Sequence, residues 1–249
     1  MSRPATRLAA TLAQADMELR LTARRGENVL VTIIVPPVVL LFFASAGVLP
    51  SPSGRPVDFL LPGSIALAII ASSLVNLGIA TAYERHYGVL KRLGGSPLTA
   101  TGLLAAKIGA VLVVEAGQVV LLVAIAVLML GWSPAPGSSP GLFVGVALLG
   151  TLAFAGLGLL LAGALRAEAT LALANALFIA AVLLGGIILP LDHLPDAVAV
   201  VAGLLPAAAL SDAFRIALGE ELDLTRPLGI LLLWGIGSTA LATRTFHWE

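Results

Sequence analysis

Residues 101–131 read TGLLAAKIGAVLVVEAGQVVLLVAIAVLMLG, and this stretch decides the fold class. It continues for about 31 residues with only two charged side chains, Lys107 and Glu115. An α-helix rises about 1.5 Å per residue, so about 20 apolar residues cross the hydrocarbon core of a bilayer, which is about 30 Å thick. The stretch therefore predicts a transmembrane helix that tilts or extends beyond the bilayer.

Five further apolar runs share this character, and the composition of the whole chain agrees with them. Of the 249 residues, 59% are hydrophobic and 11% are charged, whereas a soluble domain carries about 25% charged residues. This excludes a soluble globule, a disordered chain and a nucleic-acid-binding domain. We predict an all-α membrane protein with one transmembrane domain over residues 28–249 and six transmembrane helices at about 28–48, 59–82, 101–131, 142–165, 169–189 and 228–243.

The basic residues indicate the side of the membrane on which each connection lies, because cytoplasmic connections are enriched in Lys and Arg. With a cytoplasmic N-terminus, only Arg55, Arg215 and Arg226 fall outside. The basic residues that fall inside are Arg3, Arg7, Arg20, Arg24, Arg25, Arg85, Lys91, Arg92, Lys107, Arg166 and Arg244. Both termini are therefore predicted to be cytoplasmic.

The N-terminal segment, residues 1–27, is predicted to form a cytoplasmic amphipathic interface helix. Leu8, Leu12, Ala15 and Leu19 recur every three or four residues, which is the spacing of one helix face. The alternative is a frayed leader without regular structure.

Residues 84–93 are predicted to form a short helix at the cytoplasmic surface between the second and third spans. Charged residues alternate there with Val89, Leu90 and Leu93, and a Gly-Gly-Ser-Pro stop ends the run. The alternative is an ordinary basic loop. Because a two-residue turn would join two spans, a structured insert of this length suggests a docking element.

Residues 195–218 are predicted to form two outer half-helices that enter the outer leaflet without crossing the membrane. Pro206 divides this stretch into two apolar pieces, and each is too short to span. Pro190, Pro206 and Arg215 are the candidate residues of an outer gate.

Several kinds of catalytic site are excluded by what the sequence lacks. Neither of the two lysines, Lys91 and Lys107, follows a glycine, so a Walker A loop is absent and the chain cannot hydrolyse ATP by P-loop chemistry. The chain has no cysteine, its three histidines lie outside the apolar runs, and no span carries an aspartate. We expect no catalytic residue and no bound metal.

Four polar residues inside the spans are candidates for a substrate pathway. Glu115 lies midway along the third span, where a charge costs roughly 2.5–3.5 kcal/mol on translocon scales and must face protein or water. Gln118 follows one turn later on the same face. Asn76 and Asn175 lie on or beside ridges of small residues in the second and fifth spans. The alternative for all four is helix packing.

The order of these elements resembles the ABC type-2 exporter permeases, the group that includes the daunorubicin-resistance-like drug exporters of bacteria. Residues 84–98, ERHYGVLKRLGGSPL, are similar to the family pattern E-R-x-x-G-x-L-x-x-L-x-x-[ST]-P-[LI]. The closing residues 246–249, FHWE, resemble its F-R-W tail, with His247 in place of Arg. Residues 205–215 are similar to the outer helix region of the family.

The resemblance implies a half-transporter without enzymatic activity, placed in a bacterial cytoplasmic membrane. Two permease copies, identical or different, would assemble with two ABC ATPase subunits, and ATP and Mg would bind to the ATPase subunits, with no cofactor on this chain. The short cytoplasmic helix would be the coupling helix, and the interface helix would complete the contact. The residues implied in this coupling are Glu84, Arg85, Tyr87, Gly88, Leu90, Lys91, Arg92 and Leu93.

The expected cargo is a hydrophobic or amphiphilic compound, such as a drug, a lipid or a peptide-like molecule. A polysaccharide or glycolipid exporter is an alternative, but aromatic residues make up only 5% of the chain. A second alternative is a stand-alone secondary transporter or channel with Glu115 as its ion or proton site. Such proteins often contain inverted repeats, and the two halves of this chain show no such symmetry. A structural membrane subunit is a third alternative.

Overall fold

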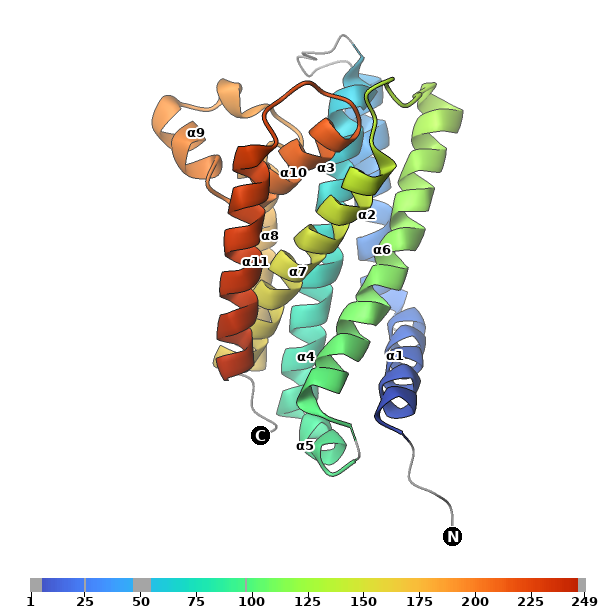
Figure 1. Cartoon of the computed structure of the whole chain (residues 1–249), viewed down its shortest axis with the longest axis vertical. Coiled ribbons are helices and arrows are strands. Elements are labelled where there is room, and N and C mark those ends of the chain that lie inside the picture. Colours follow the sequence, from blue (N-terminus) through green and yellow to red (C-terminus); the bar gives the residue numbers. More distant parts are fainter. Residues whose placement is uncertain (1–5, 25, 47–54, 97, 246–249) are drawn as a thin grey trace.

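The computed structural model describes residues 6–24, 26–46, 55–96 and 98–245, and these ranges contain helices and their connections but no strand. In Figure 1 the long helices run roughly along the vertical long axis of the molecule. In chain order the elements are α1 (Arg7–Arg24), α2 (Gly26–Ala46), α3 (Pro56–Ile70), the π-helix η1 (Ala71–Asn76), α4 (Leu77–His86), α5 (Val89–Gly94), α6 (Ala100–Leu130), α7 (Pro140–Ala164), α8 (Ala167–Leu184), the 3-10 helix η2 (Leu191–His193), α9 (Asp196–Ala202), α10 (Pro206–Ala217) and α11 (Thr225–Thr245).

Within the described residues, four helices are long and apolar enough to cross a membrane. They are the continuous helix Pro56–His86, made of α3, η1 and α4, together with α6, α7 and α8. The pair α9 and α10 would count as a fifth span only if its two halves, bent by 78°, are taken as one. The all-α membrane fold is thus confirmed. The first and sixth predicted spans correspond to α2 and α11, and crossing by these two stays a prediction.

The helix boundaries differ most from the predicted spans at the second and the fifth span. The second helix begins at Pro56 and ends at His86, so it is longer at both ends than 59–82. The fifth helix ends at Leu184 instead of residue 189. It ends there because Gly186 has a φ of +61°, a left-handed conformation that glycine adopts readily. The chain then passes close to α10. A Cβ added to Gly185 would lie only 2.9 Å from the methyl carbon of Ala207.

The two ends of the molecule carry different elements (Figure 1). The start of α1, the short helix α5 and the end of α11 lie at the lower end, and α9 and α10 lie at the upper end. The placement of both chain ends on the cytoplasmic side stays a prediction. The tail pattern at residues 246–249, the motif residue Pro97 and the last two residues of the first predicted span lie outside the described residues.

The centre of the fold is the helix Pro56–His86, whose upper half, α3, is almost completely buried. Small residues bring other helices close to it and to each other. A Cβ on Gly78 would lie 3.0 Å from the Gly158 Cα atom, so α4 and α7 touch through their backbones. On the other face of α7, Ser238 Oγ of α11 donates a hydrogen bond to the Ala153 carbonyl at 3.1 Å.

Candidate functional site

The predicted single helix over residues 84–93 is wrong, because the structure divides it into two helices. α4 ends at His86, and α5 begins at Val89. Gly88 between them has a φ of +69°, and a residue with a side chain would be strained in this left-handed conformation. The chain therefore turns a corner at Tyr87 and Gly88, and α5 is a separate helix of six residues.

The corner exposes only some of the residues that were expected to contact an ATPase. Tyr87 and Val89 are 68% and 37% exposed, and Lys91 and Arg92 are exposed as well. Leu90 is buried, and it packs in an apolar cluster made of Ala10, Leu90, Leu93, Leu98 and Leu103. In this conformation Leu90 cannot touch a partner, so it attaches α5 to α1 and to the start of α6.

Glu84 points into the molecule, where it meets a buried lysine. Lys107 Nζ of α6 donates to Glu84 Oε2 at 2.6 Å and pairs with Glu18 Oε1 of α1 at 2.9 Å. Gln14 Nε2 also donates to Glu18 Oε1, at 2.8 Å. A buried charge is tolerated when it is paired and hydrogen-bonded. This ion cluster of Glu18, Glu84 and Lys107 therefore joins α1, α4 and α6.

Arg85 has a similar inward role. Its Nη1 donates to the Gly163 carbonyl at 2.5 Å and its Nη2 donates to the Leu165 carbonyl. The last carbonyls of a helix lack intrahelical partners, and a basic side chain can satisfy them. Arg85 thereby fastens the end of α4 to the end of α7. The sequence identifies Lys107 only as one of the basic residues on the cytoplasmic side. Its neighbours in the sequence do not indicate that its partners lie 23 and 89 positions away.

The predicted pathway residues Glu115 and Gln118 of α6 both form hydrogen bonds with the π-helix η1. Glu115 accepts hydrogen bonds from Ser73 Oγ at 2.6 Å and from Thr151 Oγ1 at 2.5 Å. Gln118 accepts one from Ser72 Oγ at 2.9 Å and donates one to the Thr32 carbonyl at 2.8 Å. Two consecutive serines of the π-helix thus both face α6. Short π-helical turns inside α-helices are frequent at functional sites.

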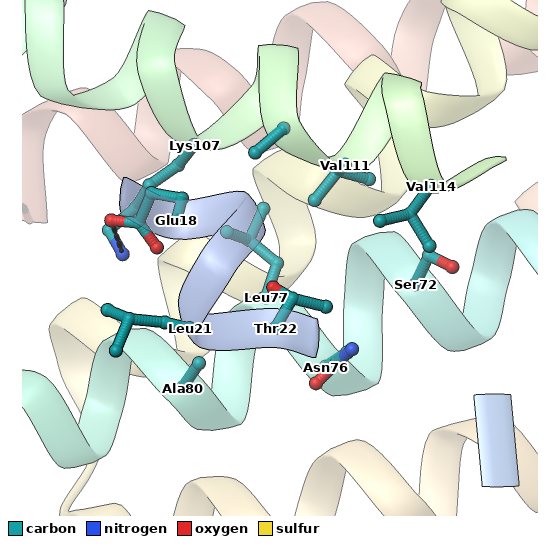
Figure 2. A pocket seen from close by; sticks show the side chains of 11 residues that line it. Glu18, Leu21, Thr22, Ser72, Asn76, Leu77, Ala80, Lys107, Val111 and Val114 are labelled. Atoms are coloured by element: carbon teal, nitrogen blue, oxygen red, sulfur yellow. Dashed lines mark ion pairs between the residues drawn. The ribbon is translucent and has the colours of Figure 1, made fainter. Parts of the chain in front are cut away.

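The two asparagines are separated. Asn76 lies at the end of η1 and lines a pocket with Ser72, Glu18 and Lys107, as Figure 2 shows. Asn175 is exposed on α8, and its Nδ2 donates to the Leu171 carbonyl of its own helix at 2.8 Å. The structure therefore groups three of the four predicted pathway residues and leaves Asn175 apart from them.

At the other end of the molecule, Arg215 of α10 is buried and holds three elements together. Its Nη1 donates to Asp212 Oδ1 at 2.7 Å, and its Nη2 donates to the Gly186 carbonyl after α8. The guanidinium carbon lies 4.0 Å from the centre of the Phe59 ring of α3, a cation–π geometry. Pro206 is the first residue of α10, and Pro190 immediately precedes η2. The two prolines thus lie at the starts of helices, and Arg215 holds α10 against α3 and the end of α8.

A comparison with protein families finds one that covers most of the chain. The family described as ABC-2 type transporter matches residues 10–218. The match includes most of α1, the α4–α5 corner, the ion cluster and the short helices α9 and α10. No protein of curated function matches the chain.

Proposed function

The chain belongs to the ABC-2 type transporter family as a membrane permease subunit, and from this premise we propose that it exports a hydrophobic or amphiphilic compound. The energy would come from a separate ABC ATPase, because neither Lys91 nor Lys107 stands in a Walker A loop. ATP and Mg would be bound by that ATPase. The proposed location is the bacterial cytoplasmic membrane, with the α5 end on the cytoplasmic side.

The observation that carries this proposal is the connection between the α4–α5 corner and the spanning helices. Tyr87, Val89, Lys91 and Arg92 present an exposed surface for the ATPase. Behind it, Leu90 packs on Leu103 of α6, and the ion cluster ties α4 and α6 to α1. A push on α5 when the ATPase closes on ATP is therefore carried directly to α6, α7 and α1.

A second permease copy completes the proposed transporter. α8 has several large apolar side chains that stay exposed, among them Leu173, Ile179 and Leu183. In the membrane such a face is covered by lipid or by another helix. We propose that a second copy, identical or related, faces this chain and that cargo passes between the two. Aromatic residues are few, and this favours small amphiphiles over polysaccharides as cargo.

The proposal is tested by reconstitution with a P-loop ATPase from the same genome. Purified together in proteoliposomes, the two should form a stable complex whose ATP hydrolysis depends on the permease. Arg92→Glu should reduce the association at least tenfold, because it reverses a charge on the exposed surface of α5. Arg166→Glu, which reverses an exposed charge between α7 and α8, is the matched control and should associate normally.

Failure of any P-loop ATPase from the same genome to associate with the wild-type chain would contradict the proposal. Equal effects of the two substitutions would show that α5 is not the docking element.

A further inference from the structure

Two cavities meet between α1, α2, η1 and α6. The smaller, of about 40 Å³, is lined by Glu18, Lys107 and Ser72 together with apolar residues of α4 and α6. The larger, of about 400 Å³, extends beside α6 as far as Leu121. They share three lining residues, Thr22, Asn76 and Val114. Figure 2 shows the smaller cavity, with Glu18 and Lys107 on one side and Ser72 on the other.

The smaller cavity is polar. Its charged lining residues are Glu18 and Lys107, which form an ion pair at 2.9 Å. Both contacts of Glu18 use its Oε1, and its Oε2 has no partner among the described residues. The Asn76 amide also lines this space without a hydrogen bond to any described residue. Since one water needs about 10–15 Å³ on this measure, the cavity has room for an ammonium-sized group.

The larger cavity is mostly apolar and opens sideways. Its walls include Leu19 of α1, Ile33 of α2 and Val113, Val114 and Leu121 of α6. Val113 and Leu121 are 57% and 37% exposed, so this space opens on the side of the bundle that faces lipid. Its one glutamine, Gln118, already has both of its polar atoms in hydrogen bonds. This space therefore suits a hydrocarbon tail.

The polar and the apolar cavity follow each other along the membrane normal in the same order as the headgroup and the tail of an amphiphile. Lys107 and Leu121 are fourteen residues apart on α6, which corresponds to about 21 Å of helix. The charged end lies nearer to α5, at the predicted cytoplasmic surface, and the apolar end lies nearer to the middle of the bilayer. An amphiphile in the inner leaflet has its headgroup and tail at these depths.

We infer that the two cavities form a binding site for a cationic amphiphile, with an amine-type headgroup beside Glu18 and an apolar tail along α6. An ammonium headgroup can donate hydrogen bonds to Glu18 Oε2 and to the side-chain oxygen of Asn76, and charge-assisted hydrogen bonds are stronger than neutral ones. A sulfate headgroup has no proton to donate, and a hydroxyl headgroup forms only the weaker neutral-donor bond. The inference deepens the proposed function and depends on it for the role of this ligand as cargo. Binding itself requires only this chain.

The test measures binding of tritiated dodecylammonium to the full chain in phosphatidylcholine nanodiscs. We expect saturable binding above that of empty nanodiscs. Unlabelled dodecylammonium should compete at least about tenfold better than dodecanol or dodecyl sulfate, a difference of about 1.4 kcal/mol. Equal competition by dodecanol would mean that the site takes any hydrocarbon chain, and this would overturn the inference.

Two matched pairs of variants locate the site. Glu18→Gln should weaken binding of the cationic probe about tenfold, whereas Asp16→Asn, on the exposed face of α1, should leave it unchanged. Gly117→Leu adds a side chain into the larger cavity, where a Cβ meets no atom within 4 Å, and should also weaken binding. Gly109→Leu has equally open surroundings on α6 but does not line either cavity, so it should bind normally.

Failure of this inference is distinguishable from failure of the proposed function. Association with the ATPase is measured on the same preparations. Association without charge-selective binding would overturn the site and leave the permease assignment intact. Charge-selective binding by a chain that associates with no ATPase would overturn the exporter proposal and support the site. Equal probe binding by Glu18→Gln and Asp16→Asn variants would overturn the placement of the headgroup.

Discussion

At the residue scale, buried polar side chains act as connections between helices. Lys107 is 1% exposed and meets carboxylates from two other helices. Glu115 is 4% exposed, and hydroxyl groups from η1 and α7 donate to both of its oxygens. These groups are satisfied by neighbours, as buried polar groups must be. The predicted alternative of helix packing therefore explains Glu115 and Gln118 without an ion.

We expect Lys107→Met to destabilise the protein strongly, because it leaves two carboxylates buried without their counter-charge. Removal of one partner from a buried ion pair costs about 3–5 kcal/mol. Arg20→Met breaks an exposed pair with Asp16 and should cost about 1 kcal/mol or less. Thermal unfolding in detergent compares the two variants. Equal losses would show that the ion cluster is not a structural connection.

We expect Glu115→Gln to fold and to transport normally, because a glutamine oxygen still accepts a hydrogen bond from Ser73 or Thr151. Glu115→Leu leaves both hydroxyls without this acceptor and should cost about 1–3 kcal/mol of stability. Transport assays in proteoliposomes and thermal unfolding check the two variants. A transport defect in a well-folded Glu115→Gln variant would instead favour the proton-site alternative.

At the element scale, the α4–α5 corner is held in place from behind. Gly88 allows the change of direction, Leu90 anchors α5, and Glu84 and Arg85 fix the end of α4. The exposed residues Tyr87 and Arg92 are therefore presented on a rigid base. A rigid base allows a contact at these exposed residues to transmit movement to the helices behind them.

Gly88→Ala should impair coupling more than folding. No atom lies within 4 Å of an added Cβ, so the cost is the left-handed backbone alone, about 1–2 kcal/mol. Relief of this strain would turn α5 away from its position and lower permease-dependent ATP hydrolysis. Gly95→Ala is the control, because Gly95 has a φ of −80° and an added Cβ makes an ordinary contact at 3.5 Å. Loss of coupling in both variants would contradict this account of the corner.

At the scale of the whole molecule, close backbone contacts set how the spanning helices pack around α3 and α4. Gly158 of α7 faces the carbonyls of Ser73 and Leu74, each 2.8 Å from where its Cβ would lie. Since backbone atoms cannot move aside cheaply, α7 fits against the π-helix only with glycine at this position. The π-helix and its partner helix thus form one packing unit.

Gly158→Ala should destabilise the fold by about 1–3 kcal/mol, because overpacking forces the backbone apart. Gly145→Ala lies on the same helix in open space and should be neutral or stabilise by about 0.5–1 kcal/mol, as alanine favours a helix. Thermal unfolding of the two variants provides the comparison. A fully stable Gly158→Ala variant would contradict the packing seen here.

The six-span arrangement is open to a direct topology measurement, since the chain has no cysteine. Single cysteines at the exposed positions Ser96 and Thr243 should react with a membrane-impermeant maleimide only from the cytoplasmic side. Cysteines at Ser133 and Glu221 should react only from outside. The pair Glu221 and Thr243 tests whether α11 crosses the membrane. Labelling of both cysteines from the same side would show that α11 does not cross the membrane.

The sequence by itself determined the all-α membrane fold class and the approximate positions of the long helices and of the two short helices α9 and α10. It did so because transfer of a segment from water to lipid depends on that segment's own residues and length. A docking element near residues 84–93 stays a prediction, and the family match covers that segment. The corner at Gly88 escaped prediction, since a glycine beside basic residues is compatible with a helix or a turn.

Only the tertiary structure decided which polar residues meet. Glu84 was expected to contact an ATPase and instead pairs with Lys107, while Asn175 lies apart from Asn76 and Glu115. Such pairings depend on which helices are neighbours and on which of their residues lie at the same depth in the membrane. The hydropathy of the sequence does not give this information. The ion cluster, the π-helix network and the two joined cavities all arise from contacts between helices far apart in the chain. For that reason the site became visible only once α1, η1 and α6 were placed against one another.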